Sequence, residues 1–532
     1  MRQSLLPILA VALILGAPVQ SQTATATLEQ VLPEGTQALA TRQSVTARDF
    51  MIAAAHPLAV EAGYDVLARG GSAADAAVAV QAMLTLVEPQ SSGLGGGGFV
   101  LHWNAATGTL SSLDARERAP EAADEGYWLD AAGEPLPFWD AVVGGRSVGV
   151  PGTPLLLETL HDRFGRLPWA ELIAPAIERA EEGFEVSPRL AGAIADAEAR
   201  GLATFEETRA YFFDEGGAPL TAGTVLRNPE LARTLRLFAD RGAAPFYTGS
   251  IARDIVAAVK TEVNPGILEL EDLASYEVID RAPVCIDYRA HEVCGMGPPS
   301  SGGLTVGQIL GLLEGFDLPG IGPGPEAAHL LLEAGRLAFA DRNLYIADSD
   351  FTDMPEGLLD RDYLRERAAL IDAAQSAGPA EAGTPPWDEA QLRNPDAERP
   401  RQGTTHFVIV DRYGDMVSAT TTIEAGFGSR VMTGGFLLNN ELTDFSFRPE
   451  AEGLPIANRV VGGKRPRSSM APTVVLRDGR PVLLTGSPGG AAIIGYTAAS
   501  IISILDWGMD PQEAIDRPNI VTFNGPAIIE KT

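Results

Sequence analysis

The chain has 532 residues, 45% of them hydrophobic, so it can bury a large core and is neither fibrous nor wholly disordered. Acidic residues outnumber basic ones by 70 to 40, and the formal net charge of −30 argues against nucleic acid or an anionic membrane as a partner. The six histidines are scattered without the spacing of a zinc site, and no metal or cofactor is expected.

Residues 1–21 have the pattern of a cleaved export signal. A charged start is followed by an apolar run at 5–17 and then by small residues. The run is short for a bilayer span, and no second run of that length follows. We therefore expect a soluble mature protein without a membrane anchor, in the periplasm or the medium.

Two helices are predicted early in the mature chain. The first covers 57–69 and ends at a pair of glycines. The second begins after Ser72, which is expected to form a capping box with Asp75, and runs to about Glu88.

The glycine-rich stretch 91–99 formally contains the G-x-G-x-x-G pattern of a dinucleotide-binding loop. Such a loop follows a strand and opens a helix, whereas this stretch follows Pro89 and precedes an apolar strand at 99–103. We therefore expect a loop in which backbones pack closely, and no nucleotide site.

Helical periodicity dominates from 152 to about 259, with 169–182 the clearest amphipathic segment. A capped helix is expected after 298–303, and another at about 326–346. Between 372 and 403 the chain is rich in Ala, Pro, Asp and Glu, so this stretch is predicted to be a mobile linker.

The two cysteines, Cys285 and Cys294, lie on either side of a predicted hairpin. If 289–290 is a two-residue turn, the cysteines are directly opposite on paired strands, where the Cα separation suits a disulfide. Because an exported protein would oxidise them, a disulfide is favoured over a free pair.

Beyond residue 404 the pattern changes to short alternating runs that predict strands. These are expected at 406–410, 416–422, 435–439, 473–476 and 481–485. The glycine-rich turn 485–490 then leads into a helix at about 491–505, and the N–H groups of such a turn are suited to receive an oxyanion.

The stretch 402–406, Gln-Gly-Thr-Thr-His, is interpreted as a self-cleavage site between Gly403 and Thr404. A threonine hydroxyl needs a base to attack an amide, and the α-amino group of an N-terminal threonine meets that need near neutral pH. Only a chain break before Thr404 creates this amine. Gly403 suits the break because it lacks a Cβ and adopts backbone angles that other residues resist.

Several separated motifs, in this order, resemble the γ-glutamyltranspeptidase family of N-terminal-nucleophile hydrolases. They lie at 55–59, 93–99, 147–152, 299–303, 404–406, 464–472 and 486–490. The resemblance implies an α+β fold, a four-layer αββα sandwich built from a large and a small subunit of one self-cleaved precursor. It places the large subunit at 22–403 and the small catalytic subunit at 404–532.

The resemblance also implies roles for individual residues. Thr404 is the implied nucleophile and Thr422 hydrogen-bonds near its amine, while Gly489 and Gly490 supply oxyanion N–H groups. For a γ-glutamyl head group, the α-carboxylate would be held by Arg116, Ser468 and Ser469, and the α-amino group by Glu424, Glu441 and Asp444. A basic patch of Arg459, Lys464, Arg465 and Arg467 would add positive charge near an anionic substrate, unless these four lie in a solvated loop.

The implied reaction transfers the γ-glutamyl group of glutathione or a related compound to Thr404, and then to water or to an amino acid or peptide acceptor. Two departures from the family pattern stand out: 446–467 contains no Tyr or Trp where relatives carry a lid tyrosine, and the chain stops at Thr532, before the family's closing strands. An open pocket favours hydrolysis over transfer, or an acylase-like specificity. Either the chain is truncated or the sheet is completed differently, which would affect stability or processing.

Two alternatives remain open at this stage. One is a related acylase acting on glutaryl-β-lactams or poly-γ-glutamate. The other is an inactive exported binding protein that has kept the pocket and lost the chemistry.

Overall fold

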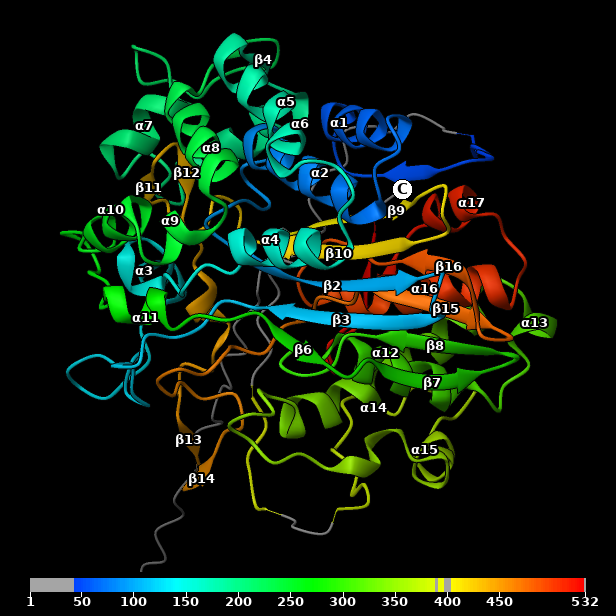
Figure 1. Cartoon of the computed structure of the whole chain (residues 1–532). Helices are drawn as coiled ribbons and strands as arrows, with labels where there is room; N and C mark the ends of the chain where they lie inside the picture. The colour runs from blue at the N-terminus through cyan, green and yellow to red at the C-terminus, as the bar shows by residue number, and fades with distance from the viewer. Residues whose placement is uncertain (1–42, 388–390, 397–402, 531–532) are drawn as a thin grey trace, which may run out of the picture.

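The computed structural model describes residues 43–387, 391–396 and 403–530 (Figure 1). Two antiparallel sheets form its centre. In spatial order, the six-stranded sheet consists of β1 (Met51–Ala53), β9 (Thr405–Val410), β10 (Met416–Thr422), β2 (Gly97–Asn104), β3 (Thr109–Ala115) and β6 (Ile279–Arg281). The four-stranded sheet consists of β16 (Arg480–Thr485), β15 (Thr473–Arg477), β8 (His291–Gly295) and β7 (Val284–Tyr288).

Both sheets combine strands from before and after Gly403. In the first sheet β9 pairs with β1, and β10 pairs with both β9 and β2. In the second sheet β15 pairs with β8. The two parts of the chain therefore build a common core, and neither part alone completes either of these two sheets.

Helices cover one face of each sheet (Figure 1). On the first sheet, α2 (Ala73–Val87) contacts β9 and β10, while α4 (Thr153–Phe164) contacts β2 and β3. On the second sheet, α12 (Gly302–Leu313) contacts β7 and β8, while α16 (Ala492–Leu505) contacts β16. The sheets meet where β10 contacts β16.

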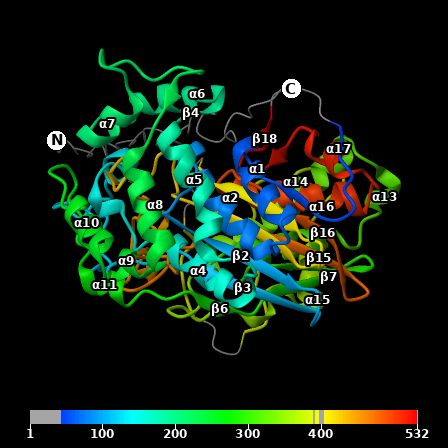
Figure 2. The ribbon, with the colours of Figure 1, turned by 45° about the horizontal axis from the view of Figure 1, so that its top comes forward.

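Further helices pack on these layers. α1 (Pro57–Ala68) and α5 (Trp169–Glu182) contact α2, and α5 lies between α2 and α8 (Pro229–Arg241), as Figure 2 shows. α14 (Pro325–Tyr345) contacts α12 on the opposite side of the molecule. The other helices are α3 (Phe138–Val142), α6 (Pro188–Glu198), α7 (Glu206–Phe212), α9 (Ala244–Tyr247), α10 (Ser250–Ala258), α11 (Leu270–Ala274), α13 (Leu318–Ile321), α15 (Arg361–Ala368) and α17 (Pro511–Ile515). Short hairpins are β4–β5 (Phe184–Glu185, Val225–Leu226), β11–β12 (Met432–Thr433, Phe436–Leu437), β13–β14 (Glu450–Ala451, Leu454–Pro455) and β17–β18 (Ile520–Val521, Ile528–Ile529).

The alanine-rich helix α2 is the most deeply buried of the early elements. Ser72 and Asp75 form the predicted capping box, and every residue of the helix is buried. Small side chains allow α2 to lie close to β9 and β10, the strands that carry Thr404 and Thr422 at their ends. The predicted helices at 57–69, 72–88 and 169–182 are confirmed.

The helix predicted after 298–303 exists, and its first N–H, that of Gly302, donates to the Oγ of Ser300 (3.0 Å). Ser301 precedes α12 and makes no side-chain cap to it. Its hydroxyl instead donates to the carbonyl oxygen of Ser468, 2.7 Å away. This serine therefore links α12 to the segment that lines the site.

The glycine-rich loop before β2 packs against other backbone, as its sequence predicted. A Cβ on Gly95 would lie 2.0 Å from the carbonyl oxygen of Leu437, and one on Gly96 would lie 1.9 Å from that of Thr422. No larger residue fits at either position, and β2 follows the loop directly.

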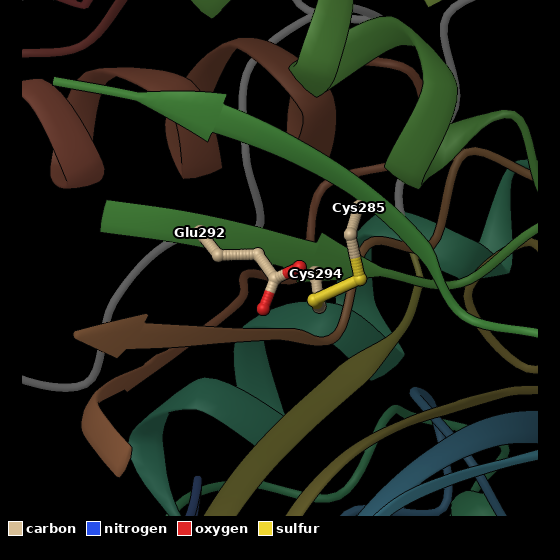
Figure 3. A group of neighbouring side chains, drawn as sticks. All are labelled: Cys285, Glu292 and Cys294. Carbon is tan, nitrogen blue, oxygen red and sulfur yellow. A yellow bond between two sulfur atoms is a disulfide. The ribbon is translucent and has the colours of Figure 1, made fainter. Parts of the chain in front are cut away.

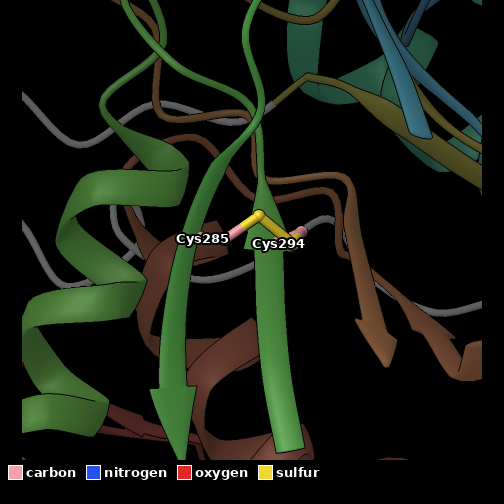
Figure 4. Close-up of a disulfide and its surroundings, with 2 residues drawn as sticks. All are labelled: Cys285 and Cys294. Atoms are coloured by element: carbon pink, nitrogen blue, oxygen red, sulfur yellow. A yellow bond between two sulfur atoms is a disulfide. The ribbon is translucent and has the colours of Figure 1, made fainter. Parts of the chain in front are cut away.

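Strands β7 and β8 carry the two cysteines (Figure 4). Cys285 pairs directly with Cys294, their Cα atoms are 4.1 Å apart, and their sulfur atoms form a disulfide. The last pair of the ladder joins Tyr288 and His291, so 289–290 is the two-residue turn that the sequence predicted.

The described part of 372–403 contains no helix or strand but is tied to the core. The N–H of Gly383 donates to Asp341 (2.8 Å), and the N–H of Asn394 donates to the carbonyl of Pro455 (3.2 Å). Residues 397–402, immediately before the expected cleavage point, and the expected export signal 1–21 lie outside the described residues. None of the helices that the structure describes has both the length and the apolar character needed to cross a bilayer.

Candidate active site

A cavity of about 290 Å³ collects most of the residues singled out in the sequence. Ten of the eleven residues given a role in cleavage, catalysis or substrate binding line it: Arg116, Gly403, Thr404, Thr422, Glu424, Glu441, Asp444, Ser468, Ser469 and Gly490. Gly489 is not among the lining residues, although it adjoins Gly490. The cysteine pair lies outside the cavity.

Thr404 lies immediately before β9 and is only 3% exposed. Its hydroxyl donates to the carbonyl oxygen of Gly403, the bond partner across the expected cleavage point. The Oγ atom of Thr422 lies 3.4 Å from that of Thr404 and 3.3 Å from the same carbonyl oxygen. Two hydroxyl groups therefore meet at one peptide carbonyl.

Gly403 has a backbone conformation that L-residues with side chains rarely adopt, with φ at 132°. A Cβ on this residue would lie 2.1 Å from the carbonyl oxygen of Glu424. The carbonyl of Gly403 can therefore face the two threonines only because this position is glycine.

Glu424 begins the loop that follows β10, and its φ of 76° places a non-glycine residue in the left-handed region. Its N–H donates to the Oγ of Thr422 (2.8 Å), and its carboxylate accepts from the side chain of Asn440 (2.5 Å). Because strained backbone persists only where its surroundings hold it, this loop is fixed at the site by both contacts.

Arg116 follows β3 and is 1% exposed. Its guanidinium contacts Glu441 and lies 2.5 Å from the carboxylate of Asp444. It also donates to the backbone carbonyls of Pro466 (3.0 Å) and Arg467 (3.1 Å). Arg116, which was expected to bind the α-carboxylate of the substrate, is thus paired with Glu441 and Asp444, two of the residues expected to bind its α-amino group.

Burial and charge oppose each other in this cluster. Burial alone would lower the pKa of Arg116, but the carboxylates of Glu441, Asp444 and Glu117 together raise it. Burial raises the pKa of Glu441 well above its usual value, and Arg116 only partly offsets this. Burial also raises the pKa of Glu117, whose carboxylate lies 3.9 Å from the guanidinium. A cation entering this cluster would relieve repulsion among the carboxylates.

The two serines face the cavity from the segment after the β13–β14 hairpin. The Oγ of Ser468 accepts from the N–H of Met470 (3.1 Å). The Oγ of Ser469 accepts from the guanidinium of Arg342 (2.7 Å). Arg342 lines the same cavity and is a functional candidate that no sequence motif indicated.

The glycine-rich turn between β16 and α16 has two residues with positive φ, Gly489 at 125° and Gly490 at 56°. The carbonyls of both residues accept hydrogen bonds from the first turn of the helix. Because N–H groups at the start of a helix have no acceptor within the helix, those of Gly489 and Gly490 can bind a ligand atom. The turn rests on a buried imidazole, because a Cβ on Gly486 would lie 2.3 Å from the ring of His406. Burial lowers the pKa of His406 to about 3, so the ring is neutral.

The four residues of the basic patch differ in their surroundings. Arg465 forms an ion pair with Asp114 (2.7 Å), and Arg467 lies 3.1 Å from Asp396. Lys464 is 1% exposed and donates to the carbonyl of Ala457 (2.6 Å). Arg459 is 30% exposed and pairs with Glu125. A solvated loop therefore does not describe the three buried members, and of the four only Arg467 lines the cavity.

The region without Tyr or Trp still forms part of the cavity wall. From 446–467 the lining includes Phe447, Arg448, Ala451 and Ile456, around the β13–β14 hairpin, and the neighbouring Phe445 also lines the cavity. The wall is thus built from two phenylalanines and a short hairpin.

Among the described residues, one group of three side chains lies close enough to hold a metal ion: Cys285, Glu292 and Cys294 (Figure 3). The two sulfur atoms are bonded to each other and are not thiolate ligands. One exposed carboxylate remains, which does not make a metal site.

Comparison with known proteins places this arrangement among related enzymes. The model of the family described as gamma-glutamyltranspeptidase matches residues 59–531. A glutathione hydrolase proenzyme of Bacillus subtilis (strain 168) is 39% identical over 490 residues, which cover 90% of this chain and 82% of the relative. The acylase ACY 1 proenzyme of Pseudomonas sp. (strain SE83) is 36% identical over 493 residues, covering 90% of this chain and 84% of the relative. The crystal structure of cephalosporin acylase from Bacillus halodurans matches with a TM-score of 0.79 and 31% identity, covering 92% of this chain and 86% of that one.

These matches extend over nearly the whole chain and include its cavity-lining residues. The chain belongs to the gamma-glutamyltranspeptidase family.

Proposed function

We propose that the chain is the precursor of a γ-glutamyltransferase and glutathione hydrolase that cleaves itself before Thr404. The observation that carries the proposal is the buried hydroxyl of Thr404, which faces the cavity and contacts the carbonyl of Gly403. This contact brings the nucleophile to the bond that must break.

In the self-cleavage step, Oγ of Thr404 attacks the carbonyl carbon of Gly403 and the peptide nitrogen departs with a proton. Thr422 stabilises the oxygen of the tetrahedral intermediate, since its hydroxyl lies 3.3 Å from that carbonyl. Water then hydrolyses the resulting ester, releasing Gly403 as a new C-terminus and Thr404 with its own α-amino group.

In the catalytic cycle, Oγ of Thr404 attacks the γ-amide carbonyl of the substrate while the α-amino group takes the proton. The N–H groups of Gly489 and Gly490 bind the oxyanion, and the leaving amine departs protonated. Water, or the amine of an amino acid or peptide, then attacks the γ-glutamyl ester and frees Thr404.

The substrate head group fits the charge pattern of the cavity. An α-carboxylate and an α-amino group share one carbon atom, so their binding groups must be adjacent, and Arg116 is adjacent to Glu441 and Asp444. We infer that the bound amino acid exchanges into these ion pairs. Its carboxylate then contacts Arg116, Ser468 and Ser469, while its ammonium group contacts Glu424, Glu441 and Asp444.

The mature enzyme is proposed to be a heterodimer of a large subunit, 22–403, and a small subunit, 404–532, folded as a four-layer αββα sandwich. The interleaving of strands from both parts supports this, because separated subunits would each leave incomplete sheets. We further propose export to the periplasm or the medium through a cleaved signal at 1–21.

Denaturing electrophoresis of protease-free protein tests the proposal. We expect two fragments, a smaller one whose N-terminal sequence is Thr-Thr-His, and release of the anilide from a γ-glutamyl anilide. Thr404→Ala should remain one band. A single band from the unaltered chain, without activity, would instead identify an inactive binding protein.

A second candidate is a related acylase that acts on glutaryl-β-lactams or on poly-γ-glutamate. It is favoured by the acylase relative and by the lid region 446–467, which lacks Tyr and Trp. Glutaryl groups lack the α-amino group and would leave Glu424, Glu441 and Asp444 without a partner. Faster cleavage of a glutaryl anilide than of a γ-glutamyl anilide would establish this candidate over the first.

A further inference from the structure

The last turn of α14 places one arginine at the wall of the cavity. Arg342 is 2% exposed, and its guanidinium donates to at least three side chains. It donates from Nε to the Oγ of Ser301 (2.8 Å), from one terminal nitrogen to Asn343 (3.0 Å) and from the other to the Oγ of Ser469 (2.7 Å). A buried, planar donor of this kind fixes the position of each acceptor.

The direction of these bonds determines what Ser469 can do. A guanidinium has donors only, so in its bond with Arg342 the serine oxygen is the acceptor. The hydroxyl hydrogen of Ser469 is therefore directed elsewhere, and the side chain borders the cavity. Ser469 is thus prepared to donate to an anion.

Arg342 is connected to the other serine, Ser468, through hydrogen bonds of Ser301. The Oγ of Ser301 accepts from Nε of Arg342 and donates to the carbonyl oxygen of Ser468 (2.7 Å). The N–H of Ser301 donates to the same carbonyl (2.8 Å). One guanidinium therefore holds the side chain of Ser469 and the backbone of Ser468.

We propose that Arg342 is a positioning residue that orients Ser468 and Ser469 toward the carboxylate of the acyl donor. This inference rests on the proposed function of the cavity. It adds a residue from the large part of the chain to a subsite otherwise held by the two serines and Arg116.

Three anilide substrates distinguish a specific effect on carboxylate binding from a nonspecific loss of activity. The γ-glutamyl anilide has both α-groups, the glutaryl anilide keeps only the carboxylate, and the 4-aminobutanoyl anilide keeps only the amine. For Arg342→Gln we expect KM to rise about 10- to 100-fold for the first two, as for loss of a hydrogen bond to a charged group. The 4-aminobutanoyl anilide should be cleaved with unchanged KM, and kcat should change little for all three.

Two further variants make the test specific. Arg342→Lys keeps one donor group but cannot hold both serines, so it should give a smaller rise in KM with the same substrate pattern. Arg336→Gln removes a guanidinium from the same helix outside the cavity and should leave all three KM values unchanged. If Arg342→Gln does not fold, the three KM values are measured with Arg342→Lys instead.

A double variant decides whether the arginine acts through the serine. Arg342→Gln combined with Ser469→Ala should raise KM no more than about twofold beyond the larger single effect. Multiplication of the two effects, or an equal loss on all three anilides, would overturn the proposal.

Failure of the proposed function is recognised separately, from the unaltered chain. If that chain neither cleaves itself nor releases anilide, the proposed function fails, and calorimetry then compares L-glutamine with 4-aminobutanamide. Arg342→Gln should weaken only the binding of L-glutamine. Equal affinity of the variant and the unaltered chain for L-glutamine would refute the positioning role.

Discussion

The hydroxyl oxygens of Thr404 and Thr422 lie 3.4 Å apart, and both are within reach of the carbonyl oxygen of Gly403. The pairing of β9 with β10 explains why these two side chains lie close together. Thr405 pairs with Thr421, so continuing the antiparallel register by one residue brings Thr404 opposite Thr422. The pair is therefore a consequence of strand register.

Replacing Thr422 with Val should slow self-cleavage by at least about 10-fold, because the donor to the Gly403 carbonyl is lost while the side-chain shape is kept. The rate is measured by following the precursor band over time after synthesis. Thr421→Val is the matched control, since that hydroxyl donates to Gln81 (2.7 Å) and takes no part in the contact with Gly403. Equal cleavage rates in the two variants would contradict the role of Thr422.

Gly403→Ala should leave most of the chain as uncleaved precursor. The substitution adds a Cβ at a φ of 132° and within 2.1 Å of the carbonyl oxygen of Glu424, so the scissile carbonyl must move. Electrophoresis measures the fraction cleaved. Gly426→Ala, whose Cβ would find its nearest neighbour 4.0 Å away, should be processed normally.

Local patterns predicted much of this fold, because they depend on neighbouring residues. The helix at 169–182 and the capping box of Ser72 and Asp75 are set by spacings of three and four residues. Thr422 was assigned from the family resemblance, although the register of the predicted strands 406–410 and 416–422 also leads to it.

The charges of the site could not be predicted in the same way. Arg116 and Glu441 are 325 residues apart, and no periodicity encodes their pairing. The burial of Arg465 and Arg467 could not be predicted, because their carboxylate partners, Asp114 and Asp396, lie far away in the sequence. Arg342 was missed because a single arginine near the end of a helix has no distinguishing motif.

Asp444→Asn should raise KM for a γ-glutamyl anilide about 10-fold or more and leave KM for a glutaryl anilide nearly unchanged. The amide oxygen can still accept from Arg116, but the charge that attracts the α-ammonium group is lost. Initial rates over a range of substrate concentrations measure both constants. A parallel rise for the two anilides would show that Asp444 acts by holding Arg116 and not by receiving the amine.

Removing the disulfide with Cys285→Ser and Cys294→Ala should lower the unfolding temperature and leave kcat unchanged. The bridge closes a short loop, with a sequence separation of 9, between strands that are already paired, so a loss of at most about 3 kcal/mol is expected. Neither cysteine lines the cavity, which is why activity should persist. Calorimetric unfolding and anilide kinetics on the same preparation check both expectations.

The buried imidazole of His102 should make the protein sensitive to acid. The ring stacks on Phe164 with centroids 3.7 Å apart, its nitrogens make no hydrogen bond within the described residues, and burial lowers its pKa to about 4 despite the nearby Asp415. Between pH 6.5 and 4 the unfolded chain binds a proton that the folded chain does not, so acidification over this range favours unfolding. Below pH 4 both states are protonated and this contribution falls no further.

His102→Phe removes this proton-binding site and keeps an aromatic ring against Phe164. Between pH 6.5 and 4.5, the variant should therefore lose about 2 kcal/mol less unfolding free energy than the unaltered chain. Urea unfolding at several pH values measures the difference, and comparison at pH 7.5 separates it from any packing change. Parallel curves for the two proteins would show that His102 titrates equally in the folded and unfolded states.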